Sequence, residues 1–184
     1  IHERLVGSEM CIRDRGNNVW VKRAGSQFND FATDLALDQF GNAYVTGSVI
    51  GNALFPPFNL TAGSYLSAFI AKYDDAGTCI YAKKGTSLTQ PVTGRSIASD
   101  IYGNCVITGD FGGNISFGGS FNLSSTGLND IFIAHYNQVG NCTGVIKAGG
   151  VSDDIGTSVC WLPSNEMISV GNYGSTASVS YTHL

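Results

Sequence analysis

The chain alternates between short apolar runs and polar turns, and no stretch of helical length carries an apolar stripe at the 3.6-residue period. The apolar runs are rich in β-branched and aromatic residues, which favour extended strands. The segments between them contain Asp, Asn and Gly, which supply local hydrogen bonds and positive φ angles. The pattern therefore predicts an all-β chain of short antiparallel strands.

The strand pattern repeats at an interval of 62 residues. Three segments align in register, at 34–47, 96–109 and 158–171. A second block, 58–79, matches 121–142 at an interval of 63 residues, and the extra residue falls in the loop that precedes it. Insertions confined to loops between matching blocks are typical of stacked units. We count two full units and the first half of a third, preceded by the last strand of an earlier unit.

Each unit is predicted to form four strands. In the first unit these lie at 35–38, 43–48, 68–73 and 79–84. Their counterparts in the second unit lie at 97–100, 105–110, 131–136 and 143–148. The third unit has its first two strands at 159–162 and 166–171, and the last strand of the preceding unit lies at 19–23. The first two strands are joined by an Asp-x-x-Gly-Asn turn, which predicts a hairpin loop with a bulge. The residues expected to shape these turns are Gly41, Asn42, Gly47, Gly103, Asn104, Gly109 and Gly171.

A four-stranded sheet of this size cannot bury both of its faces alone, yet its strands are almost continuously apolar. Sheets packed face to face around an axis, as in a β-propeller with four-stranded blades, satisfy both conditions. An immunoglobulin-like sandwich needs roughly 100 residues per unit, and solenoid coils take roughly 20 to 45. Because a closed ring needs about four to eight blades, we predict a partial β-propeller that belongs to a larger molecule.

Two sequence motifs of the repeat resemble a known family. One is Ile-Ala-Ser-Asp-x-x-Gly-Asn-x-x-x-Thr-Gly at 97–109, echoed at 35–47, and the other is Phe-Ile-Ala-Lys/His-Tyr at 69–73 and 132–136. Together they resemble the bacterial SBBP-type β-propeller repeats, and NHL-type propellers have a similar strand-turn-strand core. The resemblance implies a secreted or cell-surface scaffold or binding module, and it implies no catalytic residues. The third unit departs from the motif with Pro-Ser-Asn at 163–165.

Both ends of the chain lack the repeat. Residues 4–15 resemble an in-frame translation of the adapter used in transposase-based DNA library preparation, and residues 179–184 resemble the reverse complement of the same transposon end. We therefore predict that 1–15 and 179–184 are adapter-derived and that 16–178 is the natural, incomplete propeller. A signal peptide is not expected to be visible in such a fragment.

Pairs of carboxylates are the main candidates for a ligand site. Asp30, Asp34, Asp153 and Asp154 lie near the starts of predicted first strands, which places them on one rim of a propeller. Clustered carboxylates serve acid-base chemistry or bind calcium. Asp is also favoured in turns for local hydrogen bonding. The acidic rim is thus either a calcium or ligand site or a set of ordinary turns, and no other cofactor is indicated.

The remaining chemistry argues against a catalytic centre. His135 is the only histidine of the predicted natural chain, and it aligns with Lys72, which indicates a solvated position. The cysteines of that part allow three disulfide pairings or buried free thiols, and without a CxxC spacing they do not indicate zinc. They are Cys79, Cys105, Cys142 and Cys160. Trp20 and Tyr81 occupy equivalent strand positions, which favours packing between blades over stacking on sugars.

Composition excludes further classes of function. The formal net charge of -4 gives no reason to expect nucleic-acid binding, and no apolar run approaches the roughly 18 residues of a membrane helix. We predict a non-enzymatic scaffold or binding module, secreted or at the cell surface, whose partner is a protein or a polysaccharide. The alternative is a fragment of a propeller-fold enzyme, for example a glycan-cleaving one, with its catalytic residues in missing blades.

Overall fold

A computed structural model of the protein describes residues 8–14, 17–162, 164 and 166–182, and every regular element in this part is a β-strand. In chain order the strands are β1 (Ser8–Asp14), β2 (Asn17–Ala24), β3 (Phe31–Leu37), β4 (Ala43–Val49), β5 (Asn52–Phe55), β6 (Phe58–Thr61), β7 (Ser67–Tyr73), β8 (Cys79–Gly85), β9 (Val92–Ser99), β10 (Cys105–Ser116), β11 (Asn122–Tyr136), β12 (Cys142–Gly149), β13 (Asp154–Trp161), β14 (Met167–Tyr173) and β15 (Ser178–Thr182). The prediction of an all-β chain is confirmed.

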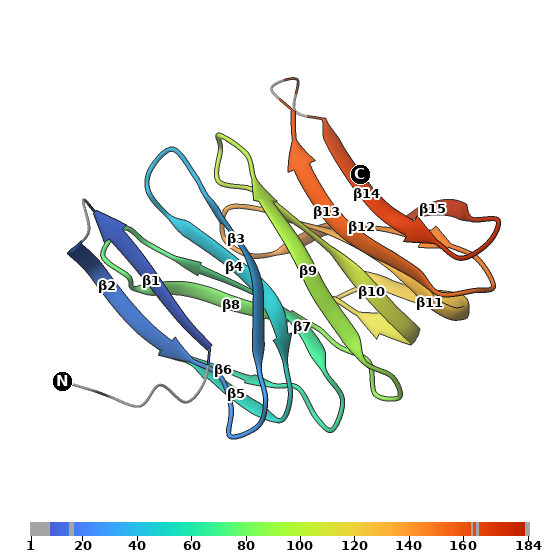
Figure 1. The fold of residues 1–184 in the computed structure, drawn as a ribbon, viewed down its shortest axis with the longest axis horizontal. Helices are drawn as coiled ribbons and strands as arrows, with labels where there is room; N and C mark the ends of the chain where they lie inside the picture. The colour runs from blue at the N-terminus through green and yellow to red at the C-terminus, as the bar shows by residue number, and fades with distance from the viewer. Residues whose placement is uncertain (1–7, 15–16, 163, 165, 183–184) are drawn as a thin grey trace.

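Two antiparallel sheets form the centre of the molecule, and each contains one repeat unit. The first has the strand order β3-β4-β7-β8, and the second has the order β9-β10-β11-β12 with β15 added beside β12. Figure 1 shows the sheets following one another across the molecule as a fan, with β3, β9 and β13 in succession. Sequential antiparallel strands in sheets stacked side by side are the architecture of propeller blades. The four-stranded units predicted from the repeat are therefore confirmed as two complete blades.

Half-sheets flank the two blades. β1 pairs with β2 at one end of the chain, and β13 pairs with β14 at the other. The residues expected to be adapter-derived thus lie partly in β1 and in β15, while 1–7, 15 and 183–184 lie outside the described residues. The origin of these segments stays a prediction from their sequence.

Two features of the strands differ from the sequence prediction. The first strands of the units begin earlier than expected, at Phe31, Val92 and Asp154. A hairpin formed by β5 and β6 occupies the region that the repeat comparison treats as a loop. In the second blade the same hairpin is an extension of β10 and β11, where Asn114 pairs with Ser124 after a register shift.

The opposite ends of the sheets differ in their connections. We call the end that carries the Asp-x-x-Gly-Asn turns the turn rim, and the end where β3 and β9 begin the loop rim.

On the turn rim, Asp38 Oδ1 accepts hydrogen bonds from the backbone N–H of Phe40 at 2.9 Å and of Asn42 at 3.0 Å. Gly41 supplies the left-handed conformation, with φ of 81°. Asp100, Tyr102, Gly103 and Asn104 repeat this arrangement in the second blade. In the third unit residues 163 and 165 lie outside the described part, and the Leu162 N–H donates to the Glu166 carbonyl at 2.7 Å.

Three of the glycines expected to shape the turns lie inside strands, within the strand ranges that the repeat predicts. Gly47, Gly109 and Gly171 belong to β4, β10 and β14. A Cβ on Gly109 would lie 1.8 Å from the carbonyl oxygen of Thr93, and one on Gly47 would lie 1.9 Å from that of Phe31. The glycines are therefore required because the bulged first strand of each blade crosses very close to the second strand.

Adjacent blades are joined by a shared apolar core and by hydrogen bonds between their first strands. One cluster combines Tyr44 and Ile70 of the first blade with Ile107, Phe132 and Tyr136 of the second. Asp34 Oδ2 in β3 accepts from the Ser96 hydroxyl at 2.8 Å and from the Ile97 N–H at 3.0 Å in β9. Ser96 Oγ in turn accepts from the Val159 N–H of β13 at 3.3 Å. The same position thus links each blade to the next one.

Large aromatic residues of the last strands pack against the following blade. Trp20 in β2 donates its indole N–H to the Asp75 carbonyl at 3.0 Å, and its ring centroid lies 5.8 Å from that of Tyr73. Tyr81 in β8 is buried, with its hydroxyl 3.5 Å from Cys105 Sγ of the second blade. Both residues have the inter-blade role that their equivalence predicts.

The four cysteines of the predicted natural chain are free thiols. Cys79 and Cys105 are buried, Cys142 is half-buried and Cys160 is exposed. Burial raises the pKa of Cys105 to about 12 and that of Cys79 to about 11. The sequence left both disulfide pairing and free thiols open, and in the structure these four thiols are unpaired.

Lys72 and His135 lie between blades, so the solvated position expected for them is wrong. Lys72 is buried, with its ammonium 4.9 Å from the centroid of the Tyr44 ring in its own blade, and a Cβ on Gly103 of the second blade would lie 3.6 Å from that ammonium. The His135 ring is 5.9 Å from that of Trp161 in the third unit, and its Nε2 is buried without a hydrogen-bond partner. Burial lowers the pKa of His135 below its usual value of 6.5.

We predict that His135 makes the fold acid-sensitive. Because the pKa of His135 is lower in the folded protein than in the unfolded chain, the unfolded chain binds this proton more readily. Stability is therefore complete above about pH 6.5 and is lost as the pH falls below that value. Thermal melts at pH 7.5 and 5.5 should show a larger drop for the wild type than for His135→Gln. Equal drops would contradict this role for the half-buried imidazole.

Candidate functional site

Two of the predicted acidic residues fasten the backbone of the loop rim. Asp154 accepts hydrogen bonds from the N–H of Gly150 at 2.6 Å and of Gly174 at 2.9 Å, and it is fully buried. Asp30 accepts from the N–H of Ser26 and of Ile50 in the same way, four residues before it and twenty after it. Each carboxylate links the loop that precedes the first strand of a unit to the segment that follows the second strand of the same unit. These oxygens are occupied by backbone donors, which favours the reading of an ordinary turn.

The four acidic residues are not brought together into one site. Asp34 lies inside β3, where it bonds to β9, while Asp30 and Asp153 line two separate pockets. Among the described residues no group of three or more His, Cys, Asp or Glu side chains is placed to hold a metal ion. The donor set therefore does not fit the calcium site considered from the sequence, because the Asp30 and Asp154 carboxylates already accept hydrogen bonds from the backbone.

The candidate site is a pocket of about 470 Å³ on the loop rim of the second blade. Asp153 lies at its edge and accepts a hydrogen bond from the Asn129 N–H at 3.3 Å. The lining consists of uncharged polar side chains, glycine backbone, one leucine and one carboxylate. It is formed by Thr89, Gln90, Gly112, Gly113, Ser125, Gly127, Leu128, Asn129 and Asp153.

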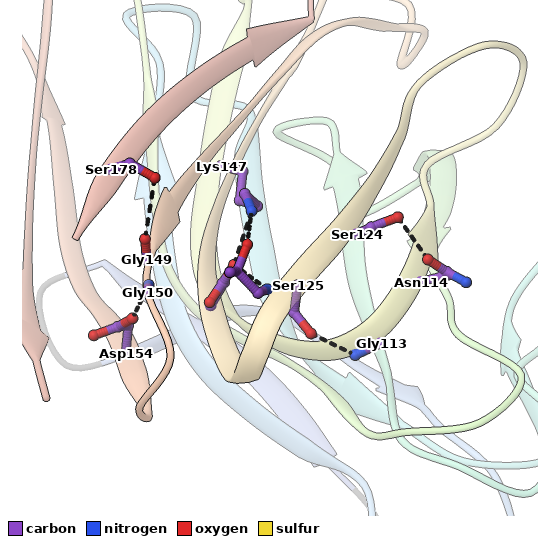
Figure 2. Close-up of polar contacts among 11 residues, drawn as sticks. Gly113, Asn114, Ser124, Ser125, Lys147, Gly149, Gly150, Asp154 and Ser178 are labelled. Atoms are coloured by element: carbon purple, nitrogen blue, oxygen red, sulfur yellow. Dashed lines mark hydrogen bonds and ion pairs between the residues drawn. The ribbon is translucent and has the colours of Figure 1, made fainter. Parts of the chain in front are cut away.

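Local backbone geometry keeps this pocket open. At Gly113 the chain has φ of 67°, and its N–H donates to Ser125 Oγ at 2.8 Å, while Ser124 Oγ donates to Asn114 Oδ1 at 2.6 Å (Figure 2). A Cβ on Gly127 would lie 2.4 Å from the Val151 carbonyl oxygen, so the connection between β12 and β13 passes directly over this position. The bend in β10 and β11 and this crossing connection form adjacent walls.

A half-buried ion pair lies in the sheet beside the pocket. Arg95 of β9 contacts the carboxylate of Asp110 in β10, and Asp110 is buried. Burial raises the pKa of the Asp110 carboxyl, an effect that Arg95 opposes and to which the charge of Asp153 adds. A carboxyl with a raised pKa near a second carboxylate is a pattern found in acid-base sites. Asp110, however, does not line the pocket, and its contact with Arg95 is typical of a structural pair.

A second ion pair, which is buried, joins Lys147 of β12 to Asp130 of β11 near the pocket. Lys147 Nζ lies 3.2 Å from Asp130 Oδ2 and donates to Thr126 Oγ1 at 2.6 Å. The Thr126 N–H donates to the same carboxylate oxygen at 2.9 Å. Figure 2 also shows the neighbouring contacts of Gly150 with Asp154 and of Gly149 with Ser178. This network fixes the middle of β11, where Leu128 and Asn129 line the pocket.

Sequence reasoning identified only Asp153 among the pocket residues. Gln90 lies in the 90–92 segment, where the second unit departs from the other units, and this irregularity was the available signal. Ser125, Leu128 and Asn129 lie in the loop-rim extension of β11, which the repeat comparison does not reveal. The pocket offers hydrogen-bond donors and acceptors with a single negative charge, and none of its lining side chains is a cysteine, histidine or lysine. Its lining side chains are able to form hydrogen bonds with a polar molecule.

Comparison with known proteins agrees with the architecture. A family model described as a β-propeller repeat, SBBP, matches residues 19–54. About 90% of the chain aligns at 26% identity with an uncharacterised WD repeat-containing protein of Acanthamoeba polyphaga mimivirus. The chain spans only 14% of the length of that protein. The match and the two blades together identify this chain as an all-β, partial β-propeller built as a repeat scaffold. Among the described residues there is no helix long and apolar enough to cross a membrane.

Proposed function

We propose that the chain is a non-catalytic binding module that acts outside the cell, secreted or at the cell surface, and that its loop-rim pocket holds a neutral polysaccharide. The observation that carries the proposal is the chemistry of the pocket, which is polar and almost uncharged. The location is supported by the resemblance to SBBP-type repeats, which occur in secreted and surface proteins.

The pocket lining suits a ligand rich in hydroxyl groups. A hydroxyl both donates and accepts hydrogen bonds, and the amides of Gln90 and Asn129 and the carboxylate of Asp153 offer paired partners for neighbouring hydroxyls. Leu128 is exposed and provides an apolar contact for the C–H face of a sugar ring. The Asp153 carboxylate disfavours anionic polymers, so a neutral chain is the preferred ligand. A pocket of about 470 Å³ lies within the roughly 300–1,000 Å³ range of ligand sites.

Calorimetric titration with neutral oligosaccharides tests the proposal. Wild-type protein should bind at least one series among β-glucan, xylan and dextran oligosaccharides. Asn129→Ala should weaken binding about tenfold, equal to about 1.4 kcal/mol, because the truncated side chain loses its hydrogen bonds to the sugar. Gln138→Ala is the matched control, since Gln138 is exposed in a turn at the other end of the sheets.

The same titrations separate binding from catalysis. Release of reducing sugar that is lost in Asp153→Asn would overturn the non-catalytic assignment in favour of a propeller enzyme. If none of the oligosaccharides binds, or if Asn129→Ala binds them as well as the wild type, the pocket is not the polysaccharide site.

A further inference from the structure

A second pocket, of about 550 Å³, adjoins the loop-rim pocket on the second blade. Thr89 lines both pockets, and Asn114 of the second pocket directly follows Gly113 of the first in the chain. The two hollows therefore form one continuous surface along the bend in β10 and β11. We call the second one the hairpin pocket, and its lining comes from within 86–89, 114–116 and 122–124.

The two pockets differ in chemistry. None of the side chains that line the hairpin pocket is charged. Ile115 and Leu123, which are 2% and 6% exposed, form its floor, and Leu88 stands at its edge with 88% of its surface exposed. The loop-rim pocket presents amides and the Asp153 carboxylate instead. A ligand that fills both pockets therefore has a hydroxyl-rich part next to an uncharged apolar part.

The exposed position of Leu88 results from a connection that is specific to the second blade. Val92 stands where the other two units have the aspartates that fasten the backbone of the loop rim. The connection is shaped by Ser87 instead, whose Oγ accepts from the backbone N–H of Thr89 and of Gln90, each at 3.3 Å. Leu88 lies at the tip of this turn and belongs to none of the apolar clusters of the described residues. Its side chain thus has no role in the packing of the blade.

A hydrogen-bond donor lies beside the apolar floor. Asn114 Oδ1 accepts from Ser124 Oγ at 2.6 Å, and Figure 2 shows the amide nitrogen of Asn114 on the side away from Ser124. Asn114 is exposed, so its N–H groups are able to donate to a ligand. A carbonyl oxygen accepts such a bond and an alkyl chain does not. An acyl group, which joins a carbonyl to an apolar chain, matches both the donor and the floor.

We propose that the hairpin pocket binds a short acyl ester carried by the polysaccharide whose hydroxyl groups occupy the loop-rim pocket. The acyl chain covers Leu88, Ile115 and Leu123, and its carbonyl oxygen accepts a hydrogen bond from Asn114. The inference rests on the proposed function and narrows it, because the ligand becomes an acylated neutral polysaccharide and not a bare one. The volume of the hairpin pocket also lies within the roughly 300–1,000 Å³ range of ligand sites.

Calorimetric titration with paired sugars tests the inference. The probes are cellotetraose, xylotetraose and isomaltotetraose, each compared with its mono-O-butyryl form. For the tetrasaccharide that the wild type binds, butyrylation should tighten binding at least about tenfold, because the acyl chain buries apolar surface.

Leu88→Asn should remove most of the gain that butyrylation gives and leave the affinity for the unmodified sugar unchanged. Asn129→Ala should weaken both forms equally, since Asn129 lies in the other pocket. Val139→Asn is the matched control, because Val139 is exposed in the turn between β11 and β12 at the other end of the sheets. Circular dichroism should be unchanged in Leu88→Asn, since the replaced side chain is exposed.

The outcomes separate this inference from the proposed function. Equal affinities of the wild type for the butyrylated and unmodified sugars, or a gain that persists in Leu88→Asn, would overturn the acyl pocket and leave the polysaccharide site standing. If no tetrasaccharide binds in either form, the polysaccharide site is overturned, and ethyl butyrate alone tests the hairpin pocket. In nuclear magnetic resonance titrations this ester should saturate the wild type at millimolar concentrations and bind Leu88→Asn at least about threefold more weakly. An ester that does not saturate, or that binds both proteins equally, would overturn the acyl pocket as well.

Discussion

Replacing Gly109 with alanine is expected to destabilise the protein by at least about 3 kcal/mol, and it should prevent the second blade from forming in its native register. A Cβ at this position would lie 1.8 Å from the Thr93 carbonyl oxygen and 2.9 Å from the Phe132 ring. The Thr93 backbone cannot retreat easily, because β9 is packed between β3 and β13. Urea denaturation followed by circular dichroism measures the loss.

Gly112→Ala provides the matched control in the same strand. A Cβ there would meet Asn129 Oδ1 at 2.9 Å, an atom that side-chain rotation moves away, and Gln90 Cβ at 3.2 Å, where a shift of a few tenths of an ångström restores ordinary contact. We expect this variant to lose less than about 1 kcal/mol. If Gly109→Ala were as stable as Gly112→Ala, the close approach of β9 and β10 would not be a requirement of the fold.

The blade architecture could be predicted from the sequence because it depends on local, repeated information. The 62-residue interval, the Asp-x-x-Gly-Asn turn and the short apolar strands all recur, and each recurrence adds support to the same four-stranded unit. The turn chemistry was also readable, since Asp38 and Asp100 accept hydrogen bonds within four residues of themselves. The β5–β6 hairpin was not predicted, because it lies where the two units differ in length.

The roles of the acidic residues could not be predicted in the same way. Asp30 and Asp154 are part of acid pairs in the sequence, but their partners include N–H groups twenty residues away, which only the folded loop rim brings near. An Asp whose carboxylate accepts hydrogen bonds from two backbone segments and an Asp that binds a ligand look the same in the sequence. The distinction depends on whether the oxygens are occupied, and this requires the geometry.

The repeat comparison also conceals the charged residues that are specific to the second blade. Asp110 stands where the first unit has Ser48, and Asp130 stands where it has Ser67. Their partners, Arg95 and Lys147, are fifteen and seventeen residues away along the chain and come from neighbouring strands. Aligning the units shows that these positions change, but the pairing depends on which side chains face one another across the sheet.

Replacing Lys147 with methionine should destabilise the protein by about 3 to 5 kcal/mol at pH 7, because it removes the only cation within ion-pair distance of Asp130 among the described residues. Asp130 is fully buried, and its Oδ1 has no hydrogen-bond partner. Without the Lys147 ammonium, the carboxylate would retain the Thr126 N–H at 2.9 Å as a donor and would otherwise be an uncompensated buried charge. Methionine preserves the length and apolar stem of the side chain, so the loss reports mainly on charge.

A double variant separates this electrostatic cost from lost packing. Asp130→Asn combined with Lys147→Met removes both charges and retains an acceptor for the Thr126 N–H, so it should recover at least half of the stability lost by Lys147→Met alone. Urea denaturation of the wild type, Lys147→Met, Asp130→Asn and the double variant at pH 7 gives the complete cycle. A double variant as unstable as Lys147→Met would show that Lys147 contributes through its packing and not through its charge.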